Sequence, residues 1–167
     1  MIKKLLLILL LILNSVLVEA KLPLDGTNFM LDPGHGGKYT RSTGEQNYNL
    51  EITNLLDAEI TKYGGKTEFT RTGDSELADN LTEDLIKRFK KAIKMRIKNP
   101  EEPVIFISLH YDANADSNIW GPQVYYNAGD NIQENFASFV AGSLWNSTAP
   151  FYVNAGTGLN WNKITPI

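Results

Sequence analysis

Residues 31–37 read LDPGHGG, an apolar strand end that turns abruptly into a proline and three glycines around a single histidine. An apolar run followed by turn residues is typical of a buried strand and the loop that leaves it. Open α/β sheets carry their reactive groups in loops of this kind, just past the carboxyl ends of the strands. The glycines on both sides of His35 leave room around its imidazole, which favours a functional histidine over a core one.

Outward from this loop, segments typical of strands alternate with segments typical of helices. The alternation predicts one three-layer α/β domain with a largely parallel sheet. Segment 104–109 is apolar on both faces, so we expect it to be the central strand. Asn80 with Glu83 three residues later resembles a capping box that opens a helix. We expect strands at 28–32, 66–70, 104–109, 123–126 and 151–153, and helices at 45–63, 80–98 and 132–144.

The spacing of apolar residues predicts which face of each helix points inward. In the first helix the apolar positions are Tyr48, Ile52, Leu55, Leu56, Ile60 and Tyr63. In the second they are Leu81, Leu85, Phe89, Ala92 and Ile93, opposite a lysine-rich face that we interpret as solvated.

Residues 1–20 have the features of a secretory signal. Lys3 and Lys4 precede the apolar run 5–18, and small residues at Val18 and Ala20 suit a signal peptidase that cuts after Ala20. An uncleaved N-terminal anchor is the alternative, although the run is short for a membrane span. We therefore expect an exported domain at 21–167, in the periplasm or at the extracellular cell wall, with no membrane attachment after cleavage.

Composition excludes some classes of function. The chain has 167 residues, no cysteine and a formal net charge of −3. Without cysteine there is neither a disulfide framework nor a lipoprotein signal. The acidic balance argues against nucleic acid as a partner.

The only two histidines, His35 and His110, each follow a predicted strand. Neighbouring parallel strands would bring both imidazoles to one edge of the sheet, where two histidines and a carboxylate are a recurrent ligand set for catalytic zinc. Glu45, at the start of the first helix, is the best-placed third ligand. The alternatives are surface histidines and a glutamate favoured by the helix dipole.

Other polar residues near these positions have supporting or structural interpretations. Asp32 is expected to fix the loop by accepting backbone N–H bonds rather than to bind metal. Asp112 and Asn114 either orient His110 or are ordinary loop residues. Arg71 and Asp74 are candidates for a structural pair.

Several motifs, in order from residue 28 to 126, resemble the zinc-dependent N-acetylmuramoyl-L-alanine amidases, the cell-wall amidases of the AmiA/AmiB/AmiC and CwlV type. In that family the first histidine, the glutamate and the second histidine bind zinc, which corresponds to His35, Glu45 and His110. The motifs are LDPGHGG (31–37), Glu45 with Asn49-Leu50, FTRTGD (69–74), IFISLHYDAN (105–114) and GPQVYY (121–126).

The resemblance implies a mixed, mostly parallel twisted sheet flanked by helices, and peptidoglycan as the substrate. The reaction it implies is hydrolysis of the amide between N-acetylmuramic acid and L-alanine, by a monomer that contains Zn²⁺. Members also carry a glutamate near the C-terminus that acts as general base, whereas no acidic residue follows Glu134 here. We therefore expect an incomplete domain that lacks its last strand and helix, with its catalytic base unassigned.

Two further functions remain open at this point. One is a catalytically impaired, zinc-bearing remnant that only binds peptidoglycan. The other is a zinc peptidase or deacetylase that acts on another bond of the wall, because the ligand set alone does not fix the substrate.

Overall fold

A computed structural model describes residues 21–39, 44–111, 122–152 and 164–166. The chain divides into two units, Met1–Asp112 and Ala113–Ile167, which we treat separately. The predicted signal at 1–20, together with Asp112 and Asn114, lies outside the described residues. Within the described ranges, no helix is both long and apolar enough to cross a membrane.

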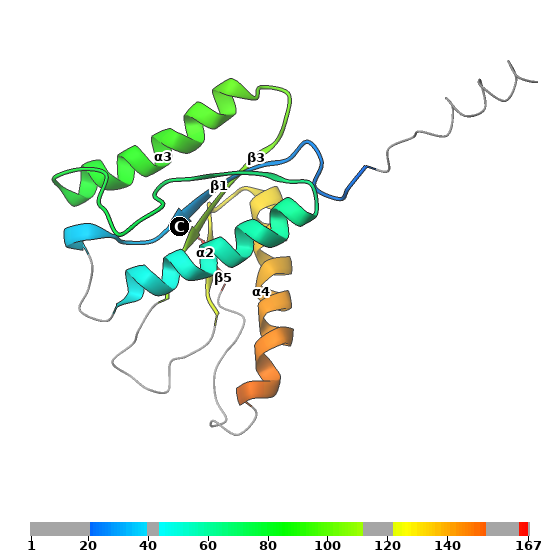
Figure 1. Ribbon diagram of the computed structural model, residues 1–167. Coiled ribbons are helices and arrows are strands. Elements are labelled where there is room, and N and C mark those ends of the chain that lie inside the picture. The colour runs from blue at the N-terminus through cyan, green and yellow to red at the C-terminus, as the bar shows by residue number, and fades with distance from the viewer. Residues whose placement is uncertain (1–20, 40–43, 112–121, 153–163, 167) are drawn as a thin grey trace, which may run out of the picture. The chain divides into compact units, whose positions relative to one another are not determined.

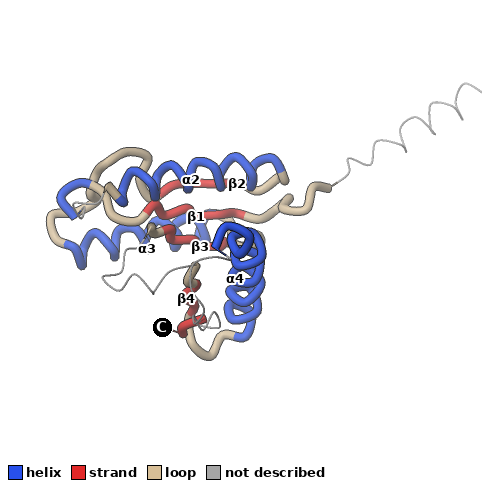
Figure 2. The backbone as a smooth tube through the Cα atoms, turned by 90° about the horizontal axis from the view of Figure 1, so that it is seen from below, coloured by secondary structure: helices blue, strands red, loops and turns tan. Residues whose placement is uncertain are grey.

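The first unit is built on a parallel sheet of three strands, with β1 (Asn28–Pro33) between β2 (Lys66–Phe69) and β3 (Val104–Leu109), as Figure 2 shows. The three predicted strands are confirmed. The central position predicted for 104–109 is wrong, because β1 is the middle strand. All six residues of β1 are buried, whereas β3 pairs with β1 alone among the described strands and leaves Phe106 37% exposed.

Two helices, α2 (Glu45–Lys62) and α3 (Leu81–Lys98), cover opposite faces of β1 (Figure 1). Successive side chains of a strand point to opposite faces, so β1 supplies both layers of core. Phe29 and Leu31 pack with Ile60 of α2, and Met30 packs with Ala92 and Met95 of α3. This arrangement is the three-layer architecture expected from the sequence.

The helix ends follow from local chemistry. Asn80 caps α3, because its side-chain oxygen accepts a hydrogen bond of 2.8 Å from the Glu83 N–H, which confirms the predicted start. After α2, Gly64 has a φ of +90°, a conformation that glycine adopts without strain. A short 3₁₀ helix, η1 (Gly37–Tyr39), follows the glycine loop.

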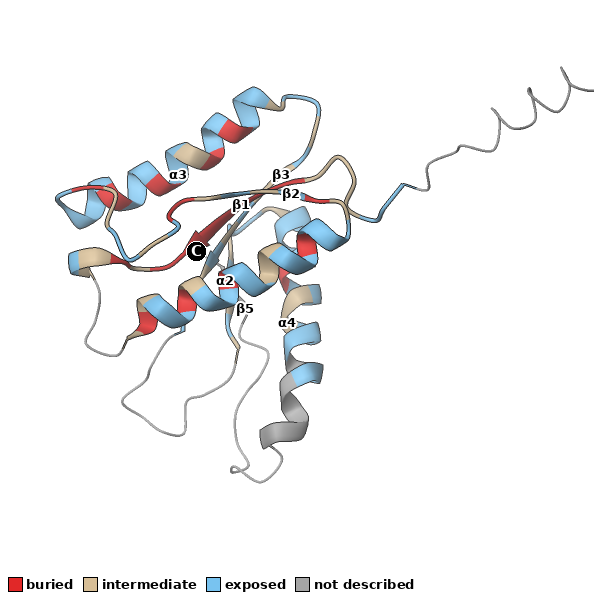
Figure 3. Cartoon of the chain, in the orientation of Figure 1, coloured by how far each residue is buried: buried red, intermediate tan, exposed pale blue. Residues whose placement is uncertain are grey.

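The predicted inward faces of both helices are largely wrong (Figure 3). Leu55 is 65% exposed and Phe89 is 58% exposed. The buried faces carry polar residues toward the carboxyl end of the sheet. Asn49 and Arg88 donate to carbonyl oxygens of the loop after β1, and Glu45 contacts His35 in that loop. Thr53 donates to a carbonyl oxygen of its own helix, and Asp84 accepts from the Leu77 N–H and from Arg88. Only farther along do apolar residues take over. The buried positions are Glu45, Asn49, Thr53 and Ile60 in α2, and Asp84, Arg88, Ala92 and Met95 in α3.

The second unit contains β4 (Val124–Tyr126), α4 (Asn131–Tyr152) and β5 (Ile164–Pro166), and its two strands pair in parallel. Asp130 precedes α4 and accepts hydrogen bonds of 3.0 Å from two backbone N–H groups of the first turn. The strand predicted at 151–153 is wrong where it is described, because Phe151 and Tyr152 belong to α4. A run of three residues is too short for its pattern to separate strand from helix.

The packing predicts unequal effects of two substitutions on α2. We expect Ile60→Ala to lower the free energy of unfolding by about 2 to 5 kcal/mol, because it leaves a cavity in the core under β1. Leu55→Ala on the exposed side should change it by less than about 0.5 kcal/mol. Urea denaturation of both variants measures the difference. Equal losses would contradict the described orientation of α2.

Candidate metal centre

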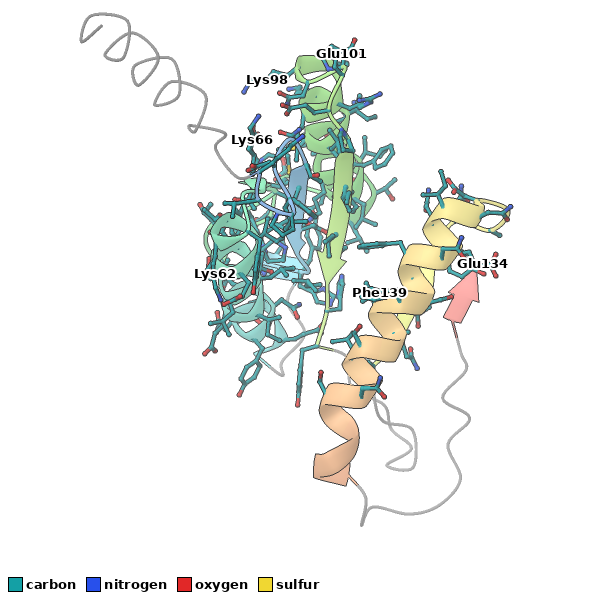
Figure 4. The ribbon with its side chains drawn as sticks, turned by 90° about the vertical axis from the view of Figure 1, so that its right-hand side faces the viewer. Lys62, Lys66, Lys98, Glu101, Glu134 and Phe139 are labelled. Atoms are coloured by element: carbon teal, nitrogen blue, oxygen red, sulfur yellow. The ribbon has the colours of Figure 1, made fainter. Side chains whose placement is uncertain are left out.

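The candidate site lies at the carboxyl end of the parallel sheet of the first unit. Lys66 is the first residue of β2, and Lys98 and Glu101 precede β3. Figure 4 shows these labelled residues at the end of the sheet from which the arrow of β3 points away. β1 and β3 pair directly and in parallel, so their carboxyl ends lie together at the other end of the sheet. His35 and His110 follow these two carboxyl ends. The predicted convergence of the two loops at one edge is therefore present.

The structure brings His35, Glu45 and His110 together. His35 Nε2 lies 3.1 Å from one carboxylate oxygen of Glu45, and His110 Nδ1 lies 3.2 Å from the other. One nitrogen or oxygen atom from each residue can be chosen so that all three lie within 4.8 Å of one another. The two imidazole rings stand nearly perpendicular, with centroids 4.7 Å apart.

This donor set fits a divalent metal ion. Ligand atoms about 2.0–2.1 Å from a tetrahedral zinc ion lie roughly 3.3 Å from one another, close to the separations of both histidines from Glu45. The Glu45 side chain is only 6% exposed, and His35 and His110 are the only basic side chains that pair with it among the described residues. A buried carboxylate needs such compensation, which a cation would supply.

Gly34 makes room for His110. A Cβ atom at Gly34 would collide with the imidazole of His110, whereas one at Gly36 would meet the Ser75 carbonyl and the Arg71 side chain. The expectation that both flanking glycines clear space for His35 is therefore corrected: Gly34 serves the other histidine. His35 itself has a φ of +61°, the left-handed conformation that non-glycine residues rarely adopt.

Two buried arginines hold the backbone that carries His35. Arg71 donates to the carbonyl oxygens of Pro33 and Gly34, each at 2.8 Å. Arg88 donates to the carbonyl oxygens of Pro33 at 3.0 Å and His35 at 2.7 Å. Arg88 was not among the site residues predicted from the sequence, because it stands among the lysines of a helix face interpreted as solvated. A local signal was its position four residues after Asp84.

The two buried arginines differ in their partners: Arg88 pairs with carboxylates, whereas Arg71 does not. Arg88 contacts the carboxylates of Asp84 at 2.5 Å and Asp32 at 2.9 Å. Burial alone would lower the pKa of Arg88, but these two carboxylates raise it above its usual value. Arg71 is hydrogen-bonded to backbone carbonyls instead, so the expected pair with Asp74 does not form. Burial, together with the nearby charge of Arg88, lowers the pKa of Arg71.

Asp32 acts through side chains rather than through the backbone N–H groups expected from the sequence. Thr70 Oγ1 and Arg88 Nη1 donate to one oxygen of Asp32, at 2.5 and 2.9 Å, and Ser108 Oγ donates to the other at 2.7 Å. Asp32 therefore ties together β1, the end of β2, β3 and α3. It does not belong to the candidate metal-binding group of His35, Glu45 and His110.

The side chain of Asn49 links Glu45 to the backbone beside both histidines. Its side-chain nitrogen lies 3.1 Å from the Gly34 carbonyl oxygen and 3.4 Å from a carboxylate oxygen of Glu45. Its side-chain oxygen accepts a hydrogen bond of 2.6 Å from the Tyr111 N–H, directly after His110. Asn49 was part of a family motif in the sequence, but its function as a bridge emerges only from the structure.

Residues 29–157 match a family model described as N-acetylmuramoyl-L-alanine amidase. The chain belongs to this family. It is 29% identical over 129 residues to the germination-specific N-acetylmuramoyl-L-alanine amidase of Bacillus subtilis, an alignment that covers 74% of the chain and 54% of that relative. It is 30% identical over 111 residues to the probable cell wall amidase LytH of Staphylococcus epidermidis, covering 62% of the chain and 32% of LytH. The chain thus spans about half or less of the length of these relatives.

Solved amidase structures share the fold. The CwlD amidase from Clostridioides difficile, solved in complex with the GerS lipoprotein, gives a TM-score of 0.62 at 25% identity and covers 78% of this chain and 69% of CwlD. The Ami1 amidase from Mycobacterium smegmatis gives a TM-score of 0.55 at 22% identity, over 74% of this chain and 67% of Ami1. The family and the α/β fold expected from the sequence are both confirmed.

The close approach of Gly34 to His110 predicts that a methyl group added at Gly34 weakens metal binding. Gly34→Ala should push the imidazole of His110 away from Glu45, so the variant should bind Zn²⁺ at least about tenfold more weakly than the wild type. A chromophoric chelator titration measures the dissociation constant. Gly73→Ala is the matched control, because its added Cβ meets open space. Unchanged affinity in Gly34→Ala would contradict this placement of His110.

Proposed function

We propose that this chain is the catalytic part of an exported zinc amidase that cleaves the amide between N-acetylmuramic acid and L-alanine in peptidoglycan. The observation that carries the proposal is the convergence of His35, Glu45 and His110 in a chain of the amidase family. Two imidazoles and a carboxylate form the ligand set that catalytic zinc sites use while they keep a further position open.

Each residue of the group has a distinct task in this proposal. His35 and His110 would each offer the ring nitrogen that faces Glu45, and Glu45 would offer a carboxylate oxygen. Bound zinc supplies a Lewis acid that activates water and polarises the carbonyl of the scissile amide. The His110 side chain is 47% exposed, compared with 22% for His35, so the substrate would approach from the side of His110.

Asn49 and the two arginines would keep this group in place before the ion binds. Asn49 joins the Glu45 carboxylate to backbone groups beside both histidines. In such sites the hydrogen-bonded surroundings orient the ligands and contribute to metal affinity. The proposed roles of Asp112 and Asn114 beside His110 remain predictions, because both residues lie outside the described ranges.

The cellular setting also belongs to the proposal. Residues 1–20 have the composition of a secretory signal, which would deliver the chain to the periplasm or the cell wall, where peptidoglycan lies. We propose that the exported chain acts as a monomer on this polymer. CwlD was solved with a lipoprotein, so a test for an activating protein partner is a natural extension of the assay below.

The reaction is tested with purified peptidoglycan. The zinc-loaded chain should release stem peptides with new L-alanine amino termini and leave the lactyl group of muramic acid free, as amino-terminal labelling and mass spectrometry of the products would show. Cleavage of another bond would favour a peptidase or deacetylase. Zinc-dependent binding without cleavage would indicate a peptidoglycan-binding remnant, so either result would overturn the proposed activity.

The proposed ligands are tested by substitution. His110→Ala should lose bound zinc, measured per chain by mass spectrometry after dialysis, and should reduce product release to background, because it removes one of three donors. Glu45→Gln should weaken zinc binding in the same way. Glu51→Gln, an exposed change on the same helix, is the matched control and should keep both properties. Full zinc retention in His110→Ala would show that the site assignment is wrong.

A further inference from the structure

Arg88 reaches the candidate metal centre from the side of the sheet opposite to α2, the helix that carries Glu45. It belongs to α3, which packs on the face of β1 where Met30 lies. Its guanidinium passes Asp32 and reaches the carbonyl oxygen of His35 at 2.7 Å. Within the described residues, no other side chain donates a hydrogen bond to that carbonyl.

Hydrogen bonds from all three of its nitrogen atoms fix the orientation of the Arg88 guanidinium. Asp84, one turn earlier on α3, contacts Nε at 2.5 Å, and Asp32 contacts Nη1 at 2.9 Å. Nη1 and Nη2 then reach the carbonyl oxygens of Pro33 and His35. A planar guanidinium presents its donors in a rigid fork, so four acceptors around one side chain define its position closely. Arg88 is only 3% exposed, so little water competes for these bonds.

This fixed donor stabilises a backbone conformation that is otherwise unfavourable. His35 has a φ of +61°, a left-handed conformation in which the Cβ of a non-glycine residue crowds the backbone. Hydrogen bonds from a charged donor are stronger than those between neutral groups, and here one is made to the His35 carbonyl. In another backbone conformation, the Cα–Cβ bond of His35 would point elsewhere and the imidazole would leave Glu45.

We propose that Arg88 is a positioning residue that presets the backbone of His35 for metal binding from the opposite face of the sheet. This inference rests on the proposed metal site. Arg71 differs, because its bonds reach the carbonyls of Pro33, Gly34, Gln46 and Gly73 but not that of His35. Arg88 is therefore the more direct determinant of where the His35 imidazole lies.

The test is Arg88→Lys, which keeps the positive charge beside Asp84 and Asp32 but cannot span all the acceptors of the guanidinium. We expect a Zn²⁺ dissociation constant about 10- to 100-fold above that of the wild type, measured with a competing chromophoric chelator. The visible absorption of the Co²⁺-loaded chain, which reports ligand geometry, should change as well. Ser108→Ala removes one donor to Asp32 and should give a smaller change in the same direction, which keeps the test available if Arg88→Lys folds poorly.

Two controls on the same helix separate positioning from general stability. Arg96→Lys alters an arginine that also donates to backbone carbonyls, those of Asn99 and Glu102, at the far end of α3. Met95→Ala opens the core beside Met30 and should destabilise the fold without touching His35. Both should bind Zn²⁺ with wild-type affinity and leave the Co²⁺ spectrum unchanged.

The outcomes distinguish this inference from the proposed function. Wild-type affinity and an unchanged Co²⁺ spectrum in both Arg88→Lys and Ser108→Ala would overturn the role of Arg88 while leaving the metal site intact. An equal loss of affinity in Met95→Ala would also overturn it, because the effect would then be one of general stability. If the wild type itself binds no more zinc than His110→Ala, the metal site fails and this inference fails with it.

Discussion

The cost of burying charge governs the first unit of this chain. Around the loop after β1, Arg88 is paired with the carboxylates of Asp32 and Asp84, and Arg71 is satisfied by backbone carbonyl oxygens. Glu45 is different, since its basic partners are two histidines that carry charge only when protonated. Unpaired buried charges cost several kcal/mol, so a bound cation would offset a penalty already present in the folded chain.

The sequence predicted the parts of the fold that follow from local chemistry. The apolar runs that begin the glycine loop and that lead into His110 located β1 and β3, and Asn80 with Glu83 located the start of α3. The meeting of His35 and His110 was also predictable, because each follows a strand and both strands are parallel. The glycine loop pointed to the same edge of the sheet, but the glycine beside His35 proved to make room for the other histidine.

The inward faces of the helices could not be predicted from periodicity. That method assumes that buried faces are apolar, whereas Asn49 and Arg88 are buried because they bind backbone and carboxylate groups brought near by other elements. The order of the strands was missed for a related reason. Segment 104–109 is more uniformly apolar than β1, which includes Asn28 and Asp32, yet β1 is the middle strand. Both of its polar residues are hydrogen-bonded there, Asn28 to the half-buried Glu102 and Asp32 to the buried Thr70.

The order of strands has a consequence for how the chain folds. β1 is the first strand of the sheet in the sequence, but its neighbours follow about 38 and 76 residues later, as the contacts of Asp32 with Thr70 and Ser108 show. Pairings between such distant segments close large loops, and their entropic cost slows folding. One edge of β1 can pair only when β3 is present, so the sheet and the cluster around Asp32 are complete only after all three strands have come together.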